Sequence, residues 1–222
     1  MIDWLRSSEE EILDREEHSA RGLRILDDLD RFNRRMGWYR FHVRMVETHW
    51  RALGSPRPFR VLDIGTGPGG LLHHLLDSGL PVEAIGIDRS PSYVNMAQER
   101  IGPRARIEVA DATAIPFADG AFDLATCTLM LHHLPRPVRE AMIAEVRRTC
   151  RSAYFFDLEV TLHGAFGAPF LGLALGLGLD AIHDGALSVR RAATYAEFAD
   201  LMRPLNVKAR RVFPSALYTG PA

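Results

Sequence analysis

A strand-like run that ends in a glycine-rich turn constrains the fold of this chain more than any other feature. Residues 61–70 read VLDIGTGPGG, so an apolar run leads directly into Gly65, Gly67 and Gly70. Glycine permits a tight turn and lets a ligand approach bare backbone, and a helical pattern begins immediately afterwards. The stretch therefore predicts the first strand, turn and helix of an open parallel sheet, with a ligand at the carboxyl end of the strand.

Short apolar runs alternate with helical stretches from Arg60 onward, which is the pattern of a parallel sheet with crossover helices. We expect strands at 61–64, 82–87, 106–109, 122–129 and 153–156. We expect helices at 69–78, 91–101 and 137–149, a short helix from the capping-box residues Thr194 and Glu197, and a terminal hairpin of 208–212 and 216–218 around Pro214. These elements predict the α/β class.

The N-terminal part of the chain is helical in pattern. Ser8 and Glu11 have capping-box spacing, and apolar residues recur at three- and four-residue steps over 29–53. Gly37 interrupts this stripe, and the SPRP stretch at 55–58 ends it, because proline cannot continue a helix. We expect the stripe to dock on the chain's own core, with a partner helix in a dimer as the alternative.

Composition excludes several classes. Lys and Arg total 27 against 28 Asp and Glu, and this balance gives no basic field for nucleic acid. The N-terminus lacks the apolar run of a signal peptide, so a cytoplasmic location is expected. Cys127 and Cys150 are too few for a disulfide framework and are expected to be reduced core thiols. His163 and His183 show no ligand spacing with cysteines or acids, so no metal site is expected.

The segment Val160–Leu179 contains no Asp, Glu, Lys or Arg. Its length is that of a membrane-spanning helix, which needs about 20 residues. Several glycines and Pro169 lower its helix propensity. We expect a flexible apolar wall over a ligand pocket, with a core helix as the alternative, and no stable membrane insertion.

Acidic residues close three of the expected strands. Asp63 and Asp88 end the first two, and Asp111 follows the third. The carboxyl ends of parallel strands meet at one edge, where Asp88 can accept both ribose hydroxyls of an adenosine. Pro68 removes a backbone N–H that a pyrophosphate would need, and Asp63 would repel phosphate. The turn favours a ligand without phosphate, although the G-x-G-x-x-G spacing keeps a nicotinamide-dependent oxidoreductase as an alternative.

Further pieces follow in a fixed order. They are Gly86-Ile87-Asp88, Ala110-Asp111-Ala112, Phe122-Asp123-Leu124 and Leu131-His132-His133-Leu134. With the glycine turn, this ordered set over Val61–Asp157 resembles the class I S-adenosylmethionine-dependent methyltransferases. The resemblance implies a Rossmann-like fold: a seven-stranded sheet of order 3-2-1-4-5-7-6 that ends in an antiparallel hairpin.

The same resemblance implies which residues hold the cofactor, S-adenosylmethionine. Asp63 and the Gly65–Gly67 backbone would contact its methionine end, Asp88 its ribose, and Asp111 with the Ala112 backbone its adenine. Residues after the fourth strand would line the sulfonium. The expected cofactor-binding residues are Asp63, Gly65, Thr66, Gly67, Asp88, Arg89, Asp111, Ala112, Thr128 and Leu129.

We expect two regions in such a chain. Residues 1–57 would form an N-terminal helical cap, and residues 58–222 the S-adenosylmethionine-binding methyltransferase domain. The apolar stripe of the cap would close over the cofactor, with Asn33, Trp38 or Tyr39 as candidate contacts.

Methyl transfer from a sulfonium is an in-line displacement, so alignment of the acceptor and exclusion of water do most of the work. A hydroxyl acceptor also benefits from a base, and histidine has a suitable intrinsic pKa. His132 and His133 follow the fourth strand, and Asp157 ends the fifth, its neighbour. We expect these three as catalytic residues, with His132 preferred over His133 as the base that pairs with Asp157. The alternative is that the histidines cap the next helix and Asp157 merely ends a strand.

The expected acceptor is a small, largely apolar or aromatic metabolite, because such sites are lined mainly by apolar groups. Residues 184–191 and the helix after them are similar to bacterial methyltransferases of polyketide and phenolic biosynthesis, which implies a phenolic oxygen. C-methylation of a quinone-like ring is the runner-up, and a non-catalytic adenosyl-binding module is the alternative from another class. The product would be S-adenosylhomocysteine, the partner a small molecule and not nucleic acid, and the protein a monomer or homodimer.

Overall fold

A single mixed sheet organises the protein. The computed structural model describes residues 3–16, 19–212 and 215–222, and within them the sheet has seven strands in the order β3-β2-β1-β4-β5-β7-β6. The strands are β1 (Phe59–Ile64), β2 (Val82–Asp88), β3 (Arg106–Val109), β4 (Phe122–Thr128), β5 (Cys150–Leu158), β6 (Val207–Val212) and β7 (Ala216–Pro221). Strands β1 to β5 are parallel, and β7 is antiparallel to both of its neighbours. The α/β class and the strand order implied by the resemblance are confirmed.

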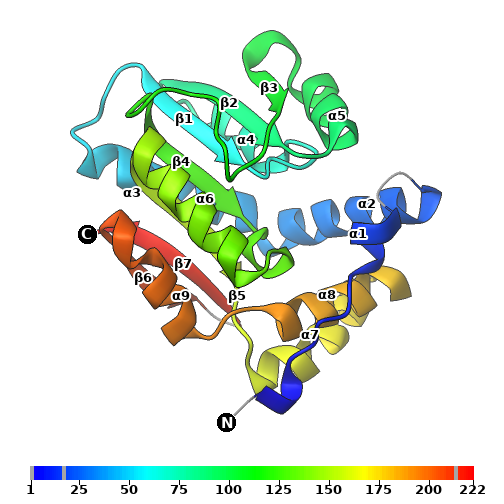
Figure 1. Cartoon of the computed structure of the whole chain (residues 1–222). Coiled ribbons are helices and arrows are strands. Elements are labelled where there is room, and N and C mark those ends of the chain that lie inside the picture. The colour runs from blue at the N-terminus through cyan, green and yellow to red at the C-terminus, as the bar shows by residue number, and fades with distance from the viewer. Residues whose placement is uncertain (1–2, 17–18, 213–214) are drawn as a thin grey trace.

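Helices cover both faces of this sheet. They are α1 (Ile12–Glu16), α2 (Ala20–Met36), α3 (Trp38–Ala52), α4 (Gly70–Leu76), α5 (Pro91–Ile101), α6 (Arg136–Thr149), α7 (Leu162–Ala174), α8 (Leu179–Arg191) and α9 (Tyr195–Met202), with short 3₁₀ turns η1 (Asp3–Leu5) and η3 (Leu131–His133). In Figure 1, α6 and α9 lie in front of the sheet and α3 lies behind it. Helices α1, α2, α7 and α8 pack together at one side of the molecule, and α2 also contacts α3.

The core consists of two apolar layers, one on each face of the sheet. Val46 of α3 and Leu72 of α4 are fully buried in one layer, together with residues of α5. Met142 of α6 and Phe198 of α9 are buried in the other. The second half of the N-terminal stripe therefore docks on the chain's own core, as the sequence predicts. Cys127 and Cys150 are buried free thiols, also as expected.

Local signals place most helix ends correctly. Gly37 takes the left-handed conformation, with φ of 71°, and separates α2 from α3 at the predicted break. The capping box of Thr194 and Glu197 forms at the start of α9, and Ser90 caps α5. The terminal strands β6 and β7 pair as the predicted hairpin. Pro214, expected at its turn, lies outside the described residues.

The helix expected from Ser8 is wrong. Residues 6–11 have no helical structure, and α1 begins only at Ile12. The Asp184 carboxylate of α8 accepts from the backbone N–H groups of Ile12 and Leu13, both at 2.9 Å. A distant side chain therefore supplies the acceptors that start this helix, in place of the Ser8–Glu11 capping box.

The expected flexible wall at Val160–Leu179 is also wrong. The segment contains helix α7, which includes Pro169, and the first residue of α8. None of its residues lines the main cavity, and much of α7 faces outward instead of lying in the core. Within residues 3–16, 19–212 and 215–222, no helix has both the length and the apolar character that crossing a membrane requires.

Candidate functional site

A cavity of about 600 Å³ lies at the carboxyl ends of the parallel strands. Its walls come from the turn after β1, from the ends of β2 to β4, and from α1, α2 and α3. All ten residues expected to hold the cofactor line it: Asp63, Gly65, Thr66, Gly67, Asp88, Arg89, Asp111, Ala112, Thr128 and Leu129. The sheet edge thus brings together residues that are far apart in the chain.

Asp63, at the end of β1, is held by two hydroxyls. Thr66 Oγ1 donates to one carboxylate oxygen at 2.7 Å, and Thr126 Oγ1 donates to the other at 2.6 Å. Burial raises the pKa of Asp63 to about 6, and the two hydroxyls oppose that rise. Each oxygen retains a further lone pair, so the group can still accept from a ligand amine.

Asp88, at the end of β2, organises the glycine turn. Its carboxylate accepts from the backbone N–H of Gly67 and of Ser90, each at 2.9 Å. Gly65 and Gly67 have φ of 65° and 52°, in the left-handed region that favours glycine. The turn is therefore fixed against β2 before any ligand enters.

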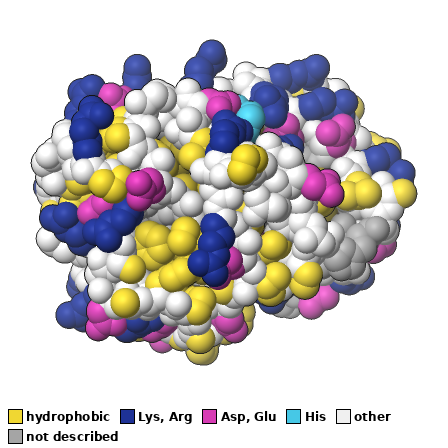
Figure 2. Space-filling view, turned by 90° about the horizontal axis from the view of Figure 1, so that it is seen from above, with side chains coloured by type: hydrophobic (Ala, Val, Ile, Leu, Met, Phe, Trp, Pro, Cys, Tyr) yellow, Lys and Arg dark blue, Asp and Glu magenta, His cyan; other side chains and the backbone are white. Residues whose placement is uncertain are grey.

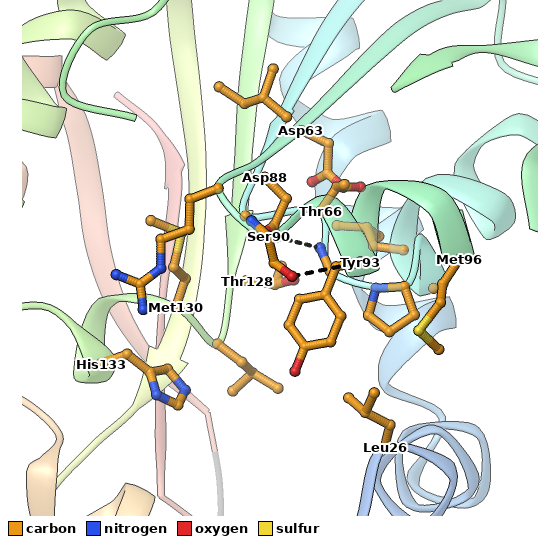
Figure 3. A pocket seen from close by; sticks show the side chains of 18 of the residues that line it. Leu26, Asp63, Thr66, Asp88, Ser90, Tyr93, Met96, Thr128, Met130 and His133 are labelled. Carbon is orange, nitrogen blue, oxygen red and sulfur yellow. Dashed lines mark hydrogen bonds between the residues drawn. The ribbon is translucent and has the colours of Figure 1, made fainter. Parts of the chain in front are cut away.

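Asp111 lies at the more open end of the cavity. Its carboxylate accepts from the backbone N–H and the hydroxyl of Thr113, both at 2.8 Å. These two hydrogen bonds lower its pKa. In Figure 3, Tyr93 and Met96 of α5 lie across the view from Met130 and His133.

The turn after β4 carries backbone strain. Leu129 has φ of 55°, although it is not glycine, and its N–H donates to the Phe156 carbonyl at 2.8 Å. Such strain costs about 1–3 kcal/mol and is concentrated at functional sites. It directs the backbone of residues 128–130 toward the cavity, where the sulfonium-lining residues were expected.

His132 and Asp157 form the predicted pair. The Nδ1 atom of His132 lies 2.6 Å from Asp157 Oδ1, and its backbone N–H donates to Oδ2 at 3.2 Å. Burial opposes ionisation of Asp157, but the imidazole outweighs it and the pKa of that carboxyl falls below its usual range. Neither residue lines the cavity, because His132 Nε2 faces Glu11, 3.8 Å away. The pair lies behind the cavity wall.

Of the two histidines after β4, His133 is the one that reaches the cavity. Its Nδ1 lies 2.9 Å from Asp14 of α1, and Arg191 of α8 donates to the same carboxylate at 2.8 Å. Burial alone would raise the pKa of Asp14, but the His133 and Arg191 contacts bring it well below its usual range. His133 is thereby held in place by two segments remote in sequence.

Glu11, His132 and His133 present ligand atoms within 4.8 Å of one another, the spacing of a cation site. However, Arg191 Nη1 lies 3.5 Å from the same Glu11 oxygen that faces both histidines. This guanidinium supplies positive charge where a cation would sit. His133 and Arg191 act to lower the pKa of Glu11, but its burial has the larger effect and raises that pKa. The arrangement is that of an ion-pair cluster between the N-terminal segment and the end of β4.

The N-terminal helices cover the cavity. Asn33 and Tyr39 line it, whereas Trp38 does not. The Tyr39 hydroxyl donates to Asp30 at 2.8 Å, and burial with this contact raises the pKa of Tyr39 far above its ordinary value. Arg100 Nη1 of α5 lies 3.5 Å from Asp30 Oδ1, the same oxygen that accepts from Tyr39. The ion pair of Asp30 and Arg100 thus joins α2 to α5 at the cavity wall.

Sequence reasoning missed several groups at this site, and His42 and Glu11 are two of them. His42 of α3 lines the cavity while its Nδ1 lies 2.7 Å from the Tyr154 hydroxyl, and burial lowers its pKa to about 3. Glu11 joins the histidine cluster from a non-helical segment. The helical stripe gave no signal for His42, since it lies between the apolar positions, and Glu11 was assigned to a capping box.

Comparison with known proteins supports this picture. Residues 61–153 match a family described as a methyltransferase domain. An uncharacterized methyltransferase of Mycolicibacterium gilvum is 35% identical over 140 residues, which cover 61% of this chain and 53% of that relative. A demethylmenaquinone methyltransferase of Deinococcus radiodurans is 34% identical over 90 residues, or 37% of each chain. The chain thus spans about half the length of the first relative and less of the second.

Solved structures share the whole architecture. The plantazolicin methyltransferase BpumL, in complex with a monoazolic desmethylPZN analog and SAH, matches with a TM-score of 0.70 over 100% of this chain and 96% of that one, at 14% identity. A SAM dependent methyltransferase from Aquifex aeolicus matches with a TM-score of 0.56 over 78% and 86%, at 18% identity. At such identities the likeness establishes the fold.

A sheet of this order, with a glycine turn at its centre and acids at its strand ends, is the class I methyltransferase fold. The methyltransferase domain at residues 61–153 lies on that fold. The chain is therefore similar to class I S-adenosylmethionine-dependent methyltransferases in sequence over residues 61–153, and it has their fold.

Proposed function

We propose that this protein transfers the methyl group of S-adenosylmethionine to a small, largely apolar or aromatic acceptor, with a phenolic oxygen as the acceptor atom. The observation that carries this proposal is the cavity at the sheet edge, where Asp63, Asp88 and Asp111 surround a glycine turn. A dinucleotide would place a pyrophosphate against these carboxylates, whereas S-adenosylmethionine carries no phosphate.

Each carboxylate suits one part of that cofactor. Asp63 is buried at the end of β1 and would accept from the amino group of the methionine end. Asp88 keeps lone pairs beyond its bonds to Gly67 and Ser90, and would accept from the ribose hydroxyls. Asp111 and the Ala112 backbone would bind adenine at the open end, and Thr128 with Leu129 would line the sulfonium.

Residues 1–57 serve, in this proposal, as a cap on the methyltransferase domain of residues 58–222. The support is that α1 and α2 contribute Leu13, Leu26, Leu29 and Asn33 to the cavity wall. An apolar wall excludes water and aligns an acceptor with the methyl group, which is most of what this displacement requires.

The acceptor side favours a neutral, apolar molecule. Leu26, Leu29, Met130, Leu134 and Val138 contribute apolar side chains to the lining of the cavity. On the face drawn in Figure 2, Lys and Arg side chains are interspersed with Asp and Glu instead of forming a basic groove. A nucleic acid would need such a groove.

His133 is the group that we propose takes the proton of a hydroxyl acceptor, because it lines the cavity and Asp14 orients its ring. The buried His132 and Asp157 act in this proposal as positioning residues that fix the turn carrying His133. A His132–Asp157 dyad with His132 as the base stays a prediction, and it would require the acceptor to reach a side chain that does not line the cavity.

C-methylation of a quinone-like ring is the second candidate. The Deinococcus radiodurans relative is named a demethylmenaquinone methyltransferase, and it matches 37% of this chain. A ring carbon as acceptor would also fit an apolar cavity, and it would use the same cofactor side.

The test combines binding with turnover. Calorimetry should show S-adenosylhomocysteine binding to the whole chain and no binding of NADH. Release of S-adenosylhomocysteine is then followed with a panel of phenols and hydroxyquinones, and mass spectrometry with fragmentation locates the new methyl group on oxygen or carbon. Tight NADH binding without S-adenosylhomocysteine binding would overturn the proposal. Binding without turnover on any acceptor would instead indicate an adenosyl-binding module.

A further inference from the structure

Helix α7 exposes an unbroken apolar surface, which we call the α7 stripe. It consists of Leu162, Phe166, Phe170 and Leu173, which are 51%, 59%, 75% and 65% exposed, and continues to Leu179 of α8, which is 80% exposed. The spacing of three and four residues places the four α7 side chains on one helical face. Few other large apolar side chains in the described part of the chain are this exposed, so the stripe is a concentrated feature.

The opposite face of α7 is packed against the protein. Gly164 and Gly172 are buried, and a Cβ on Gly172 would lie 2.8 Å from Ile182 of α8. Helix α7 is therefore apolar on its packed face and on its outer face alike. A helix with this character is normally covered on all sides. The α7 stripe is thus an apolar helix face that the described part of the chain leaves exposed.

An exposed tryptophan lies near the N-terminal end of the stripe. Leu5 of η1 belongs to a small core with Val160 and Ala165, so η1 packs on the start of α7 (Figure 1). Trp4, its neighbour, is 68% exposed. Tryptophan and phenylalanine are preferred where protein meets the boundary between water and hydrocarbon.

Arginines lie at the other end of the stripe. Arg35 of α2 donates to the Leu175 carbonyl, and Arg24 lines a small hollow with Gly178 and Leu179. These two guanidinium groups have no carboxylate within ion-pair distance in the described residues.

The carboxylates that reach this end are already paired. Asp28 contacts Arg31 and accepts from Gly178 N–H at 2.8 Å, and Asp180 lies 2.7 Å from Arg21. Arg24 also acts electrostatically on Asp180, which Arg21 already contacts, so arginines outnumber the carboxylates that they share at this end of the stripe, although the whole chain has a formal charge of -1.

We propose that the α7 stripe docks on the surface of an anionic lipid bilayer. Apolar side chains with an aromatic edge would enter the headgroup boundary, and Arg24 and Arg35 would face anionic headgroups. Helix α7 has 13 residues, fewer than the roughly 20 that span a bilayer, so it would lie along the surface. This docking is independent of the proposed methyl transfer.

The test is co-sedimentation of the full chain with vesicles. One set contains equimolar phosphatidylglycerol and phosphatidylcholine, and the other phosphatidylcholine alone. We expect binding to the first set that exceeds binding to the second and weakens with salt. The double variant Phe166→Ser, Phe170→Ser should lower partition into both sets by about tenfold or more. The double variant Arg24→Gln, Arg35→Gln should lower partition only into the anionic vesicles.

A matched control uses an exposed apolar residue outside the stripe. Val109 is 56% exposed on β3, and Val109→Ser should leave partition unchanged. Circular dichroism melts of all variants verify that they fold. Wild-type chain that stays in the supernatant with both vesicle sets overturns the proposal, and so does binding that both phenylalanine substitutions leave intact.

Trp4 provides an independent readout. Its emission should shift to shorter wavelength when anionic vesicles are added, and Trp4→Phe should abolish the shift, since Trp38 and Trp50 pack against the core. Light scattering tests the other occupant, a second copy of this chain. A dimer that the double serine variant converts to monomers, without vesicle binding by the wild type, would assign the stripe to a protein interface and refute lipid docking.

Discussion

The two sides of the cavity are built in different ways. On the cofactor side, Asp63 and Asp88 are fixed by partners close by in the sheet or turn, such as Thr66 and Ser90. On the acceptor side, His133 is held by Asp14 and Arg191, from the N-terminal segment and from α8. The acids and the glycine turn of the first side can each be recognised in a short stretch of sequence, although pairing of β1 with β4 brings Thr126 to Asp63. The second side depends on segments from the two ends of the chain, which carry no such local pattern.

This difference suggests that the two sides can be altered separately. Residues at the strand ends should govern cofactor affinity, and residues around His133 should govern turnover. A substitution on one side that changes cofactor affinity and turnover equally would contradict this separation of roles.

The largest effect is expected for His133→Gln. Loss of a proton acceptor should lower turnover on a hydroxyl acceptor by about 10²- to 10⁴-fold, while affinity for S-adenosylhomocysteine stays nearly constant. Initial rates and calorimetry measure the two properties. His183→Gln, at an exposed histidine outside the cavity lining, is the matched control and should change neither. Normal turnover in His133→Gln would leave alignment alone as the mechanism.

A pair of glycine substitutions tests how tightly the cofactor side is built. Gly69 and Gly79 have similar φ, 77° and 80°, but a Cβ on Gly69 would lie 3.2 Å from the Ala97 backbone, whereas one on Gly79 meets nothing within 4 Å. Gly79→Ala should cost about 1–2 kcal/mol of unfolding free energy from φ alone. Gly69→Ala should cost roughly 1–3 kcal/mol more, because α5 must move. Urea unfolding measures the free energy of unfolding of both variants. Equal losses would contradict the expected clash between a Cβ on Gly69 and Ala97.

Asp88→Ala sharpens the comparison on the cofactor side. The loss of a charged acceptor should weaken S-adenosylhomocysteine binding by about 1–3 kcal/mol. Asp111→Ala should weaken it less, because Asp111 is exposed and its hydrogen bonds to Thr113 compete with the ligand. The rate at saturating cofactor should change little in either variant. An Asp111 effect larger than that of Asp88 would reverse the expected roles.

The smallest effect is a pH dependence from Asp63. Burial raises its folded-state pKa from 3.8 to about 6, so ionising it costs folding free energy. Its contribution to stability is greatest below the unfolded pKa and is lost as pH rises through about 6. Binding a cationic amino group has the opposite sign, so cofactor affinity should rise over the same range. Calorimetry at several pH values should show this rise in the wild type and not in Asp63→Asn.

Much of the fold could be predicted because its signals are local. The alternation of strands and helices, the glycine turn and the caps at Ser90 and Thr194 each depend on a few adjacent residues. The strand-end acids were found for the same reason, since a parallel sheet brings the carboxyl ends of its strands to one edge.

The remaining features could not be read locally. Glycines and Pro169 weaken the helix propensity of residues 160–174, yet packing of Gly172 against Ile182 allows α7 to form. Composition likewise could not tell that α7 faces outward. For Glu11, the capping-box spacing was present, but the ion pairs with the histidines and Arg191 favoured an extended segment.

The hydrogen bonds from Asp184 to α1 have a consequence for the order in which the molecule is completed. Helix α1 has five residues, too few to be stable alone, and the acceptors for its first N–H groups come from a carboxylate 172 residues later in the chain. During synthesis, the β1–α4 turn can therefore form long before the wall that Leu13 and Asp14 supply. The cavity is complete only after α8 has left the ribosome. A nascent chain would therefore have the strand-end residues that face the cofactor before it has the wall formed by Leu13 and Asp14.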